Sequence, residues 1–104
     1  MIISEFLKDH TAVRISKRLL LDPGLTEIAK CTACVLIALP PERCPSGRRL
    51  AEIMHTNKNA VARALRQLEN AGYLARFPHH EGGRSRGTSY IIYNSPEDNP
   101  KFHR

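Results

Sequence analysis

Apolar side chains recur with a helical period just after the proline-rich centre of the chain. Leu50, Ile53 and Met54 are spaced i, i+3 and i+4, which predicts about two turns of amphipathic helix. Ser46 is expected to cap this helix, because its hydroxyl can accept a hydrogen bond from a backbone N–H of the first turn. His55 interrupts the pattern, so we expect a tight turn there.

A second amphipathic helix is predicted over residues 57–71. Asn57 is a favourable N-cap, and Gly72 supplies the left-handed residue that commonly ends a helix. The apolar stripe consists of Val61, Ala64, Leu65 and Leu68. The opposite face is small, basic and amide-bearing, with Lys58, Asn59, Ala62, Arg63, Arg66 and Asn70. Two helices joined by a short turn, with such a face on the second, favour insertion into a DNA major groove.

The segments before this two-helix motif are expected to complete the core. Alternation of apolar and polar residues predicts a strand over 11–16. Residues 1–10 are ambiguous, and a short amphipathic helix is one interpretation. Thr26 is a candidate cap for the most hydrophobic helix of the chain, 28–39, which two prolines end. We expect this helix to pack beneath the motif.

Two β-rich runs follow the motif. Leu74–Phe77 and Thr88–Tyr93 predict strands, and residues 78–87 between them are rich in glycine and arginine. Two strands joined by such a tip form a hairpin, which in this position would be a wing. The last residues contain two prolines and no clear pattern. We therefore expect a single domain over 1–94 and a flexible tail over 95–104.

Composition and charge point to a polyanionic partner. The chain of 104 residues fits one domain, with a formal net charge of +6 and a pI near 9.7. Residues 46–104 hold ten Lys and Arg against five Asp and Glu, whereas residues 1–45 hold six against five. No apolar run is long enough to span a bilayer and the first residues do not resemble a signal peptide. An odd number of cysteines, three, favours a reducing cytoplasm over a disulfide framework.

The motif resembles the winged helix-turn-helix superfamily. The resemblance rests on Leu50-Ala51, Asn57–Val61 and Arg63–Leu74, about a third of the chain, and is greatest to short bacterial regulators, MarR-like and related, and to DNA-binding domains of plasmid or phage proteins. It departs at His55, where the family usually has glycine or another small turn residue. The resemblance implies an α+β, mainly α fold, with a three-helix core, a C-terminal β-hairpin wing and an additional N-terminal strand.

The resemblance also implies a homodimer that binds double-stranded DNA as a transcriptional regulator. We expect the apolar N-terminal segment, and with it the central helix, to supply the dimer contact. The predicted DNA-binding residues are Arg48, Arg49, Asn57, Lys58, Asn59, Ala62, Arg63, Arg66, Arg84 and Arg86. Arginine can pair bidentately with guanine and asparagine with adenine, while arginines at a wing tip fit a narrow minor groove. The alternative is that these residues form only a solvated charged face.

Other chemistry is less consistent with the sequence. Cys31 and Cys34 form a Cys-x-x-Cys that Cys44 with His55 or the pair His79-His80 could extend to a metal site, but a second matching pair is missing. Cysteines in an Ala-rich helix also behave as small hydrophobes. The acidic residues Glu27, Glu52 and Glu69 are scattered, so we expect no enzyme, no metal and no cofactor.

Two other functions use the same fold. The chain could be the DNA-binding module of a plasmid or phage replication or partition system, which would coat an array of repeats. It could also be a winged-helix module that binds another protein through the same helix face. The basic second half favours DNA, and a chain of this length leaves little room for a domain that binds a small-molecule effector.

Overall fold

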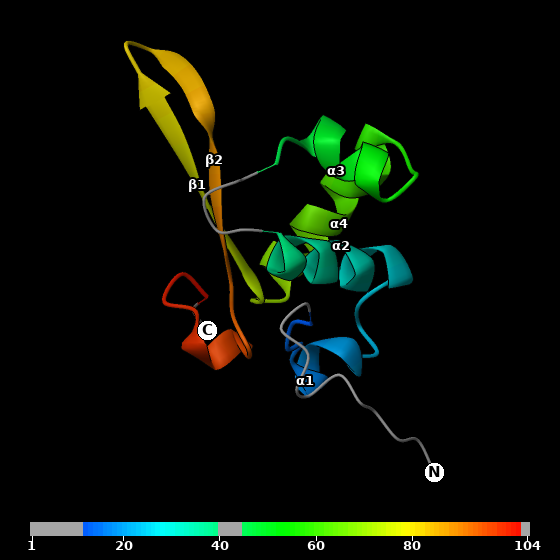
Figure 1. Cartoon of the computed structure of the whole chain (residues 1–104). Helices are drawn as coiled ribbons and strands as arrows, with labels where there is room; N and C mark the ends of the chain where they lie inside the picture. The colour runs from blue at the N-terminus through cyan, green and yellow to red at the C-terminus, as the bar shows by residue number, and fades with distance from the viewer. Residues whose placement is uncertain (1–11, 40–44, 103–104) are drawn as a thin grey trace.

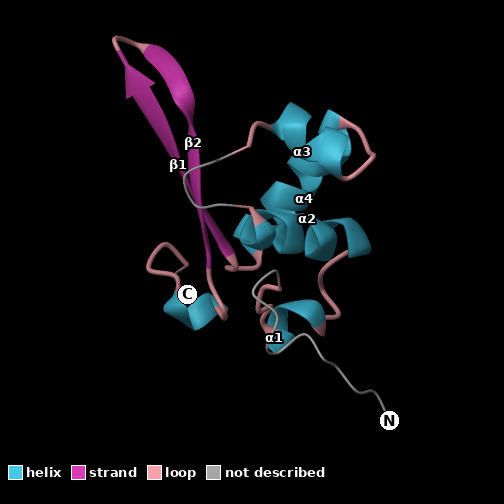
Figure 2. Ribbon diagram, viewed as in Figure 1, coloured by secondary structure: helices cyan, strands magenta, loops and turns pink. Residues whose placement is uncertain are grey.

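The computed structural model describes residues 12–39 and 45–102. Along the chain these form α1 (Lys17–Leu20), α2 (Glu27–Ala38), α3 (Gly47–Ile53), α4 (Lys58–Asn70), β1 (Leu74–Glu81), β2 (Arg84–Ile92) and a 3-10 helix (Pro96–Asp98). The α-helices gather on one side, and the hairpin of β1 and β2 extends well beyond them (Figure 1). Figure 2 shows that helices dominate and that the two antiparallel strands form the described sheet. This arrangement is a winged helix-turn-helix, as expected.

Each of the four α-helices begins at a polar cap. The side-chain oxygens of Thr26, Ser46 and Asn57 accept hydrogen bonds from the backbone N–H three residues later, at 3.2, 3.1 and 2.8 Å. These contacts satisfy an N–H group that the first helical turn leaves without a partner. The three predicted caps are confirmed. Ser16 caps α1 in the same way, through the N–H of Leu19 at 3.3 Å, and this cap was not predicted.

The core lies where α2 and α3 pack against α4. The apolar stripe predicted for α4 is buried, with Val61 and Leu68 inaccessible to solvent. The stripe belongs to a core cluster with residues of the other three helices and the start of the hairpin, and these include Leu19, Ala29, Ala33, Leu50, Tyr73 and Leu74. Burying one such large apolar side chain contributes roughly 1.5–3 kcal/mol. The stripe therefore fixes which side of α4 faces inward.

Each of the two helices of the motif is followed by a residue with positive φ. His55 has φ 55° in the turn between α3 and α4, and Gly72 has φ 91° after α4. The N–H of Gly72 donates to the carbonyl of Glu69, and that of Tyr73 to the carbonyl of Leu68, both at 3.0 Å. This pair of bonds is a Schellman motif, which explains why the helix ends there. Histidine tolerates the left-handed conformation better than bulkier residues do, so the departure at His55 leaves the turn intact.

The predicted N-terminal strand is wrong. Residues 12–16 have no regular secondary structure, and α1 follows them directly. Alternation over so few residues does not make a strand without a neighbouring strand to pair with. Ser16 instead caps α1 and donates its hydroxyl hydrogen to the carbonyl of Asn94 at 2.7 Å. The helix considered for residues 1–10 lies outside the described residues.

The hairpin is confirmed, but its strands are longer than predicted. They reach Glu81 and Arg84, so most of the expected tip, 78–87, is strand. Gly82 and Gly83 alone form the turn, with φ 58° and 80°. Two consecutive residues with positive φ fit the two-residue turn whose twist matches an antiparallel ribbon. The pairing register shifts between Pro78 and His80, next to a residue that has no N–H to give to a ladder.

Residues 95–102 pack against the fold rather than forming the loose tail that their composition suggests. The buried side chain of Asn99 donates to the carbonyl of Gly72 at 3.0 Å. Arg18 of α1 forms an ion pair with Glu97, and this guanidinium holds the pKa of Glu97 at about 2. The ammonium of Lys101 lies 4.3 Å from the centre of the Phe77 ring at the base of the hairpin. The segment thus joins α1, the end of α4 and β1.

Tyr73 ties α1 and its following turn to the start of the hairpin. Its hydroxyl donates to Oδ2 of Asp22 at 2.7 Å, and its side chain is almost completely buried. This hydrogen bond lowers the pKa of Asp22, while burial and the neighbouring carboxylate raise the pKa of Tyr73. Both groups therefore keep the protonation states that maintain the bond near neutral pH.

Candidate nucleic-acid interface

The outer face of α4 brings five of the predicted residues together. Lys58, Asn59, Ala62, Arg63 and Arg66 are all exposed, and the opposite side of the helix is the buried stripe. In an α-helix, residues three and four apart lie on the same side. Ala62 therefore stands between Asn59 and Arg66. We call these five residues the recognition face.

The charges of the recognition face are available to a ligand. Within the described part of the chain, Lys58, Arg63 and Arg66 form no ion pair with a carboxylate. Glu69, the acidic residue of α4, forms its ion pair with Arg76 of β1 and not with a cation of the recognition face. An unpaired, solvated guanidinium can bind a phosphate or a base edge without first breaking a protein contact.

The helix before the turn presents two more predicted residues, but their charge is partly neutralised. Arg48 and Arg49 are exposed at the start of α3. Both contact the carboxylate of Glu52 one turn later, at 3.7 and 3.2 Å. Surface pairs of this kind contribute little energy and exchange readily. These arginines can reach a phosphate, but they would have to leave Glu52 to do so.

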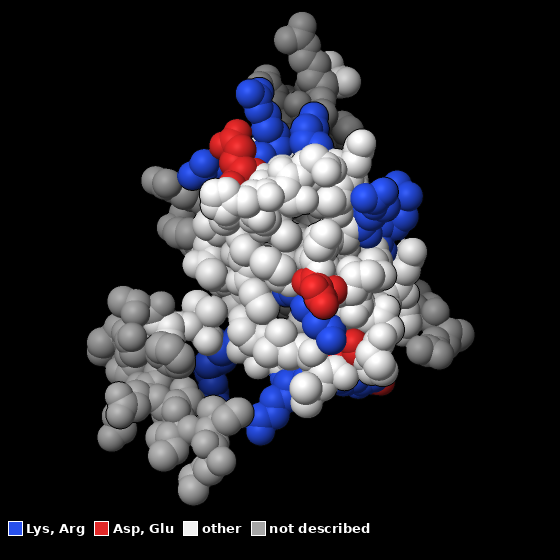
Figure 3. All heavy atoms as spheres, turned by 90° about the vertical axis from the view of Figure 1, so that its right-hand side faces the viewer, with Lys and Arg blue, Asp and Glu red and all other residues white. Residues whose placement is uncertain are grey.

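Asn57 links the turn to the recognition face. Its Oδ1 accepts from the N–H of Ala60, so the side chain holds the first turn of α4. Figure 3 shows the side of the molecule that carries the turn: most of the Lys and Arg side chains stand around its edge, and acidic side chains lie beside some of them, at the upper left and near the centre. The first turn of α4 also carries the positive end of the helix dipole. The cap of Asn57 therefore fixes the first turn of α4, where the helix dipole adds to the charge of the exposed Lys58.

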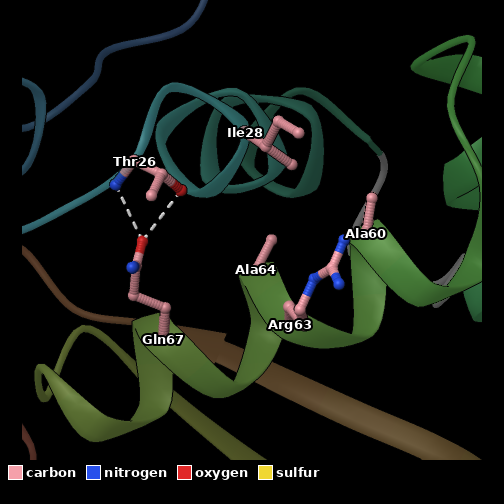
Figure 4. Close-up of a pocket in the computed structure, with 6 residues that line it drawn as sticks. All are labelled: Thr26, Ile28, Ala60, Arg63, Ala64 and Gln67. Carbon is pink, nitrogen blue, oxygen red and sulfur yellow. Dashed lines mark hydrogen bonds between the residues drawn. The ribbon is translucent and has the colours of Figure 1, made fainter.

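A contact that sequence reasoning missed lies beside the recognition face. Oε1 of Gln67 accepts two hydrogen bonds from Thr26, from the backbone N–H at 2.8 Å and from Oγ1 at 3.0 Å. An open pocket of about 240 Å³ lies next to it, lined by Thr26, Ile28, Ala60, Arg63, Ala64 and Gln67. Figure 4 shows these side chains between α2 and α4. No local pattern predicts a bond between residues 41 positions apart.

The wing residues occupy the hairpin, as predicted. Arg84 begins β2 and Arg86 follows within the same strand. Their side chains lie outside what the structure describes, so the predicted contact to a minor groove stays a prediction. The backbone nevertheless places this part of β2 far from the helices, at the extended end of the hairpin (Figure 1).

The Cys-x-x-Cys pair lies on α2. Cys31 is exposed and Cys34 half-buried, and burial raises the pKa of the Cys34 thiol. Among the described residues, no three His, Cys, Asp or Glu side chains are arranged to hold a metal ion. Cys44 and the side chains of His79 and His80 lie outside the description, so the larger site considered from the sequence is not tested.

Comparison with known proteins supports the same assignment. Residues 42–85 match the family model described as MarR family, a winged helix-turn-helix family of DNA-binding transcriptional regulators. The match covers α3, α4 and β1 and ends at the start of β2. Neither the curated proteins nor the solved structures contain a significant match to the chain. None of the helices within residues 12–39 and 45–102 has the length and hydrophobicity of a membrane-spanning segment.

Proposed function

We propose that this protein, a winged helix-turn-helix whose residues 42–85 match the MarR family model, binds double-stranded DNA in a sequence-specific way and regulates transcription. In this proposal α4 enters the major groove and the hairpin lies along the adjacent minor groove or backbone. The observation that carries it is the recognition face: exposed basic and amide side chains, whose cations form no ion pair within residues 12–39 and 45–102, on a helix whose other side is fixed in the core.

The residues divide into two roles by their place on the fold. Four residues have the hydrogen-bonding groups to read base edges, namely Lys58, Asn59, Arg63 and Arg66, and Ala62 is small enough to let the helix approach or to meet a thymine methyl. Phosphate contacts fall to the residues around them, namely Arg48, Arg49 and Asn57. Arg84 and Arg86 would enter the minor groove, where negative potential is greatest. This division is the usual one, because phosphate contacts position and base contacts specify.

The DNA-bound form is proposed to be a homodimer in the cytoplasm. The MarR family usually forms dimers, and two copies would read two half-sites about one helical turn apart. A pair of recognition faces would also give many phosphate contacts, so affinity should fall steeply as salt rises. We propose no cofactor, no enzymatic activity and no small-molecule effector.

Binding-site selection from random duplexes, followed by footprinting, tests the proposal. A regulator should select one short sequence and protect a single operator, whereas a replication or partition protein should protect an extended set of repeats. A protein-interaction module would give no electrophoretic mobility shift with random duplexes, even at low salt. That last result would overturn the proposal.

Arg63→Ala separates base reading from charge. If Arg63 reads a base, the variant should lose about 1–3 kcal/mol of binding free energy and tolerate more bases at one position. Lys17→Ala is the matched control, because it removes the same charge from the exposed surface of α1, away from α4 (Figure 1). An equal loss on all sequences would instead assign Arg63 to the DNA backbone.

A further inference from the structure

We propose that Gln67 is a positioning residue for DNA recognition: its side-chain oxygen holds α4 against the N-terminus of α2 and so sets where Arg63 and Arg66 face. This inference rests on the proposed function and deepens it. Gln67 itself is not required to touch DNA. It acts through the helix that carries the recognition face.

The geometry couples the start of one helix to the middle of another. Oε1 of Gln67 accepts from both the backbone N–H and the Oγ1 hydroxyl of Thr26. The same hydroxyl accepts from the N–H of Ala29 at 3.2 Å, which is the N-cap of α2. One threonine therefore caps α2 and holds α4 (Figure 4). The amide oxygen uses both of its acceptor positions in doing so.

A pocket beside Gln67 separates the facing surfaces of α2 and α4, so the hydrogen bonds to Thr26 hold the two helices together there. The apolar side chains that line the pocket beside Gln67 do not fill it. Ala60 and Ala64 have only a methyl group, and the side chain of Ile28 is 42% exposed. Apolar packing therefore leaves about 240 Å³ open between α2 and α4. The rest of the buried stripe, Val61, Leu65 and Leu68, packs into the core. The hydrogen bonds of Gln67 thus hold α4 to α2 at a place where apolar packing is incomplete.

A small roll of α4 toward this pocket would move the recognition face. Arg63 lines the pocket one turn before Gln67, and Arg66 is its immediate neighbour. Bidentate pairing with a base depends on the direction of the guanidinium, whereas attraction to phosphates depends mainly on charge. Loss of the contact should therefore reduce discrimination between sequences more than it reduces binding to random DNA.

Two variants of equal side-chain length test this. Gln67→Met cannot accept the bonds from Thr26, whereas Gln67→Glu can accept both but has no N–H to donate. We measure the ratio of affinity for the selected site to affinity for random duplex, together with the melting temperature. We expect Gln67→Met to lower this ratio about tenfold, with a small change in melting temperature, because exposed hydrogen bonds add little net stability. Gln67→Glu should weaken binding to both DNAs through its charge and keep the ratio.

Three results would overturn the inference. A wild-type ratio in Gln67→Met would show that the contact does not position α4. Equal losses of affinity for both DNAs, together with a lower melting temperature, would show a merely structural role. A ratio in Gln67→Glu as low as in Gln67→Met would mean that the amide of Gln67 contacts DNA itself.

A readout without DNA separates failure of this inference from failure of the proposed function. Amide hydrogen exchange at Thr26 reports whether its N–H is held. We expect about tenfold faster exchange in Gln67→Met than in the wild type or in Gln67→Glu. Unchanged exchange would overturn the contact itself, whatever the DNA result. If exchange is faster in Gln67→Met but the wild-type protein does not discriminate between the two DNAs, the contact is real and the proposed function is refuted.

Discussion

Gly72→Ala should destabilise the fold by more than any glycine substitution in the hairpin turn. Gly72 has φ 91°, a conformation that a residue with a Cβ rarely adopts. A Cβ built there would lie 2.7 Å from Cβ of Pro96 and 2.8 Å from the Phe102 ring. These distances are too short for carbon atoms in contact. The substitution therefore strains the backbone and displaces the C-terminal segment at once.

The two costs can be separated with a matched control. Gly83 also has a positive φ, 80°, but a Cβ there would meet nothing within 4 Å. Gly83→Ala should therefore cost about 1–2 kcal/mol, the backbone part alone. Gly72→Ala adds about 1–3 kcal/mol for overpacking, a total of about 2–5 kcal/mol. The difference between the two variants measures the packing of the C-terminal segment.

Urea denaturation followed by circular dichroism gives both free energies of unfolding. The double variant Gly72→Ala with Phe102→Ala should regain part of the loss relative to Gly72→Ala alone, because one of the two obstructing side chains is removed. Equal losses of unfolding free energy for Gly72→Ala and Gly83→Ala would contradict this prediction. They would mean that residues 95–102 do not pack against the end of α4.

Three further predictions concern single contacts. Asn57→Ala should cost about 1 kcal/mol of stability by removing the cap of α4; Asn57→Asp should keep that stability but bind DNA more weakly, and unchanged binding would argue against a phosphate nearby. Glu97 has its pKa lowered from 4.5 to about 2 by Arg18, so its contribution is present above pH 4.5 and lost as pH falls toward 2; Glu97→Gln should flatten this small decline in urea titrations across that range. Arg66→Ala should lose about 1–3 kcal/mol of binding and relax one base position in site selection; the same loss on every duplex would assign it to phosphates.

Local patterns were enough to predict the helix-turn-helix. The stripe of α4, its cap at Asn57 and its end at Gly72 all depend on residues within one or two turns of each other, and the structure has them as expected. The exposed face of α4 follows directly, because fixing the buried side of a helix also fixes the outer side. The predicted position of the hairpin was also correct, because its two strands and the glycines between them are adjacent in the sequence.

Contacts between distant parts of the chain account for what the sequence did not show. The amide of Asn99 reaches the carbonyl of Gly72, and the Arg18–Glu97 pair joins residues 79 positions apart. Prolines and charges in the last ten residues look like a loose tail when no partner is visible. The contact between Thr26 and Gln67 was hidden in the same way. The strand expected over 11–16 failed because a strand depends on a neighbour that alternation alone does not supply.

In the proposed complex, the outer face of α4 lies in the major groove. A photocrosslinker on Ala62→Cys, in a chain whose three native cysteines are replaced by serine, tests it most directly on the selected duplex. Ala62 is exposed in the middle of the recognition face, so we expect crosslinks confined to one or two neighbouring bases within the selected sequence. Crosslinks scattered along the duplex, or none from a bound protein, would contradict it.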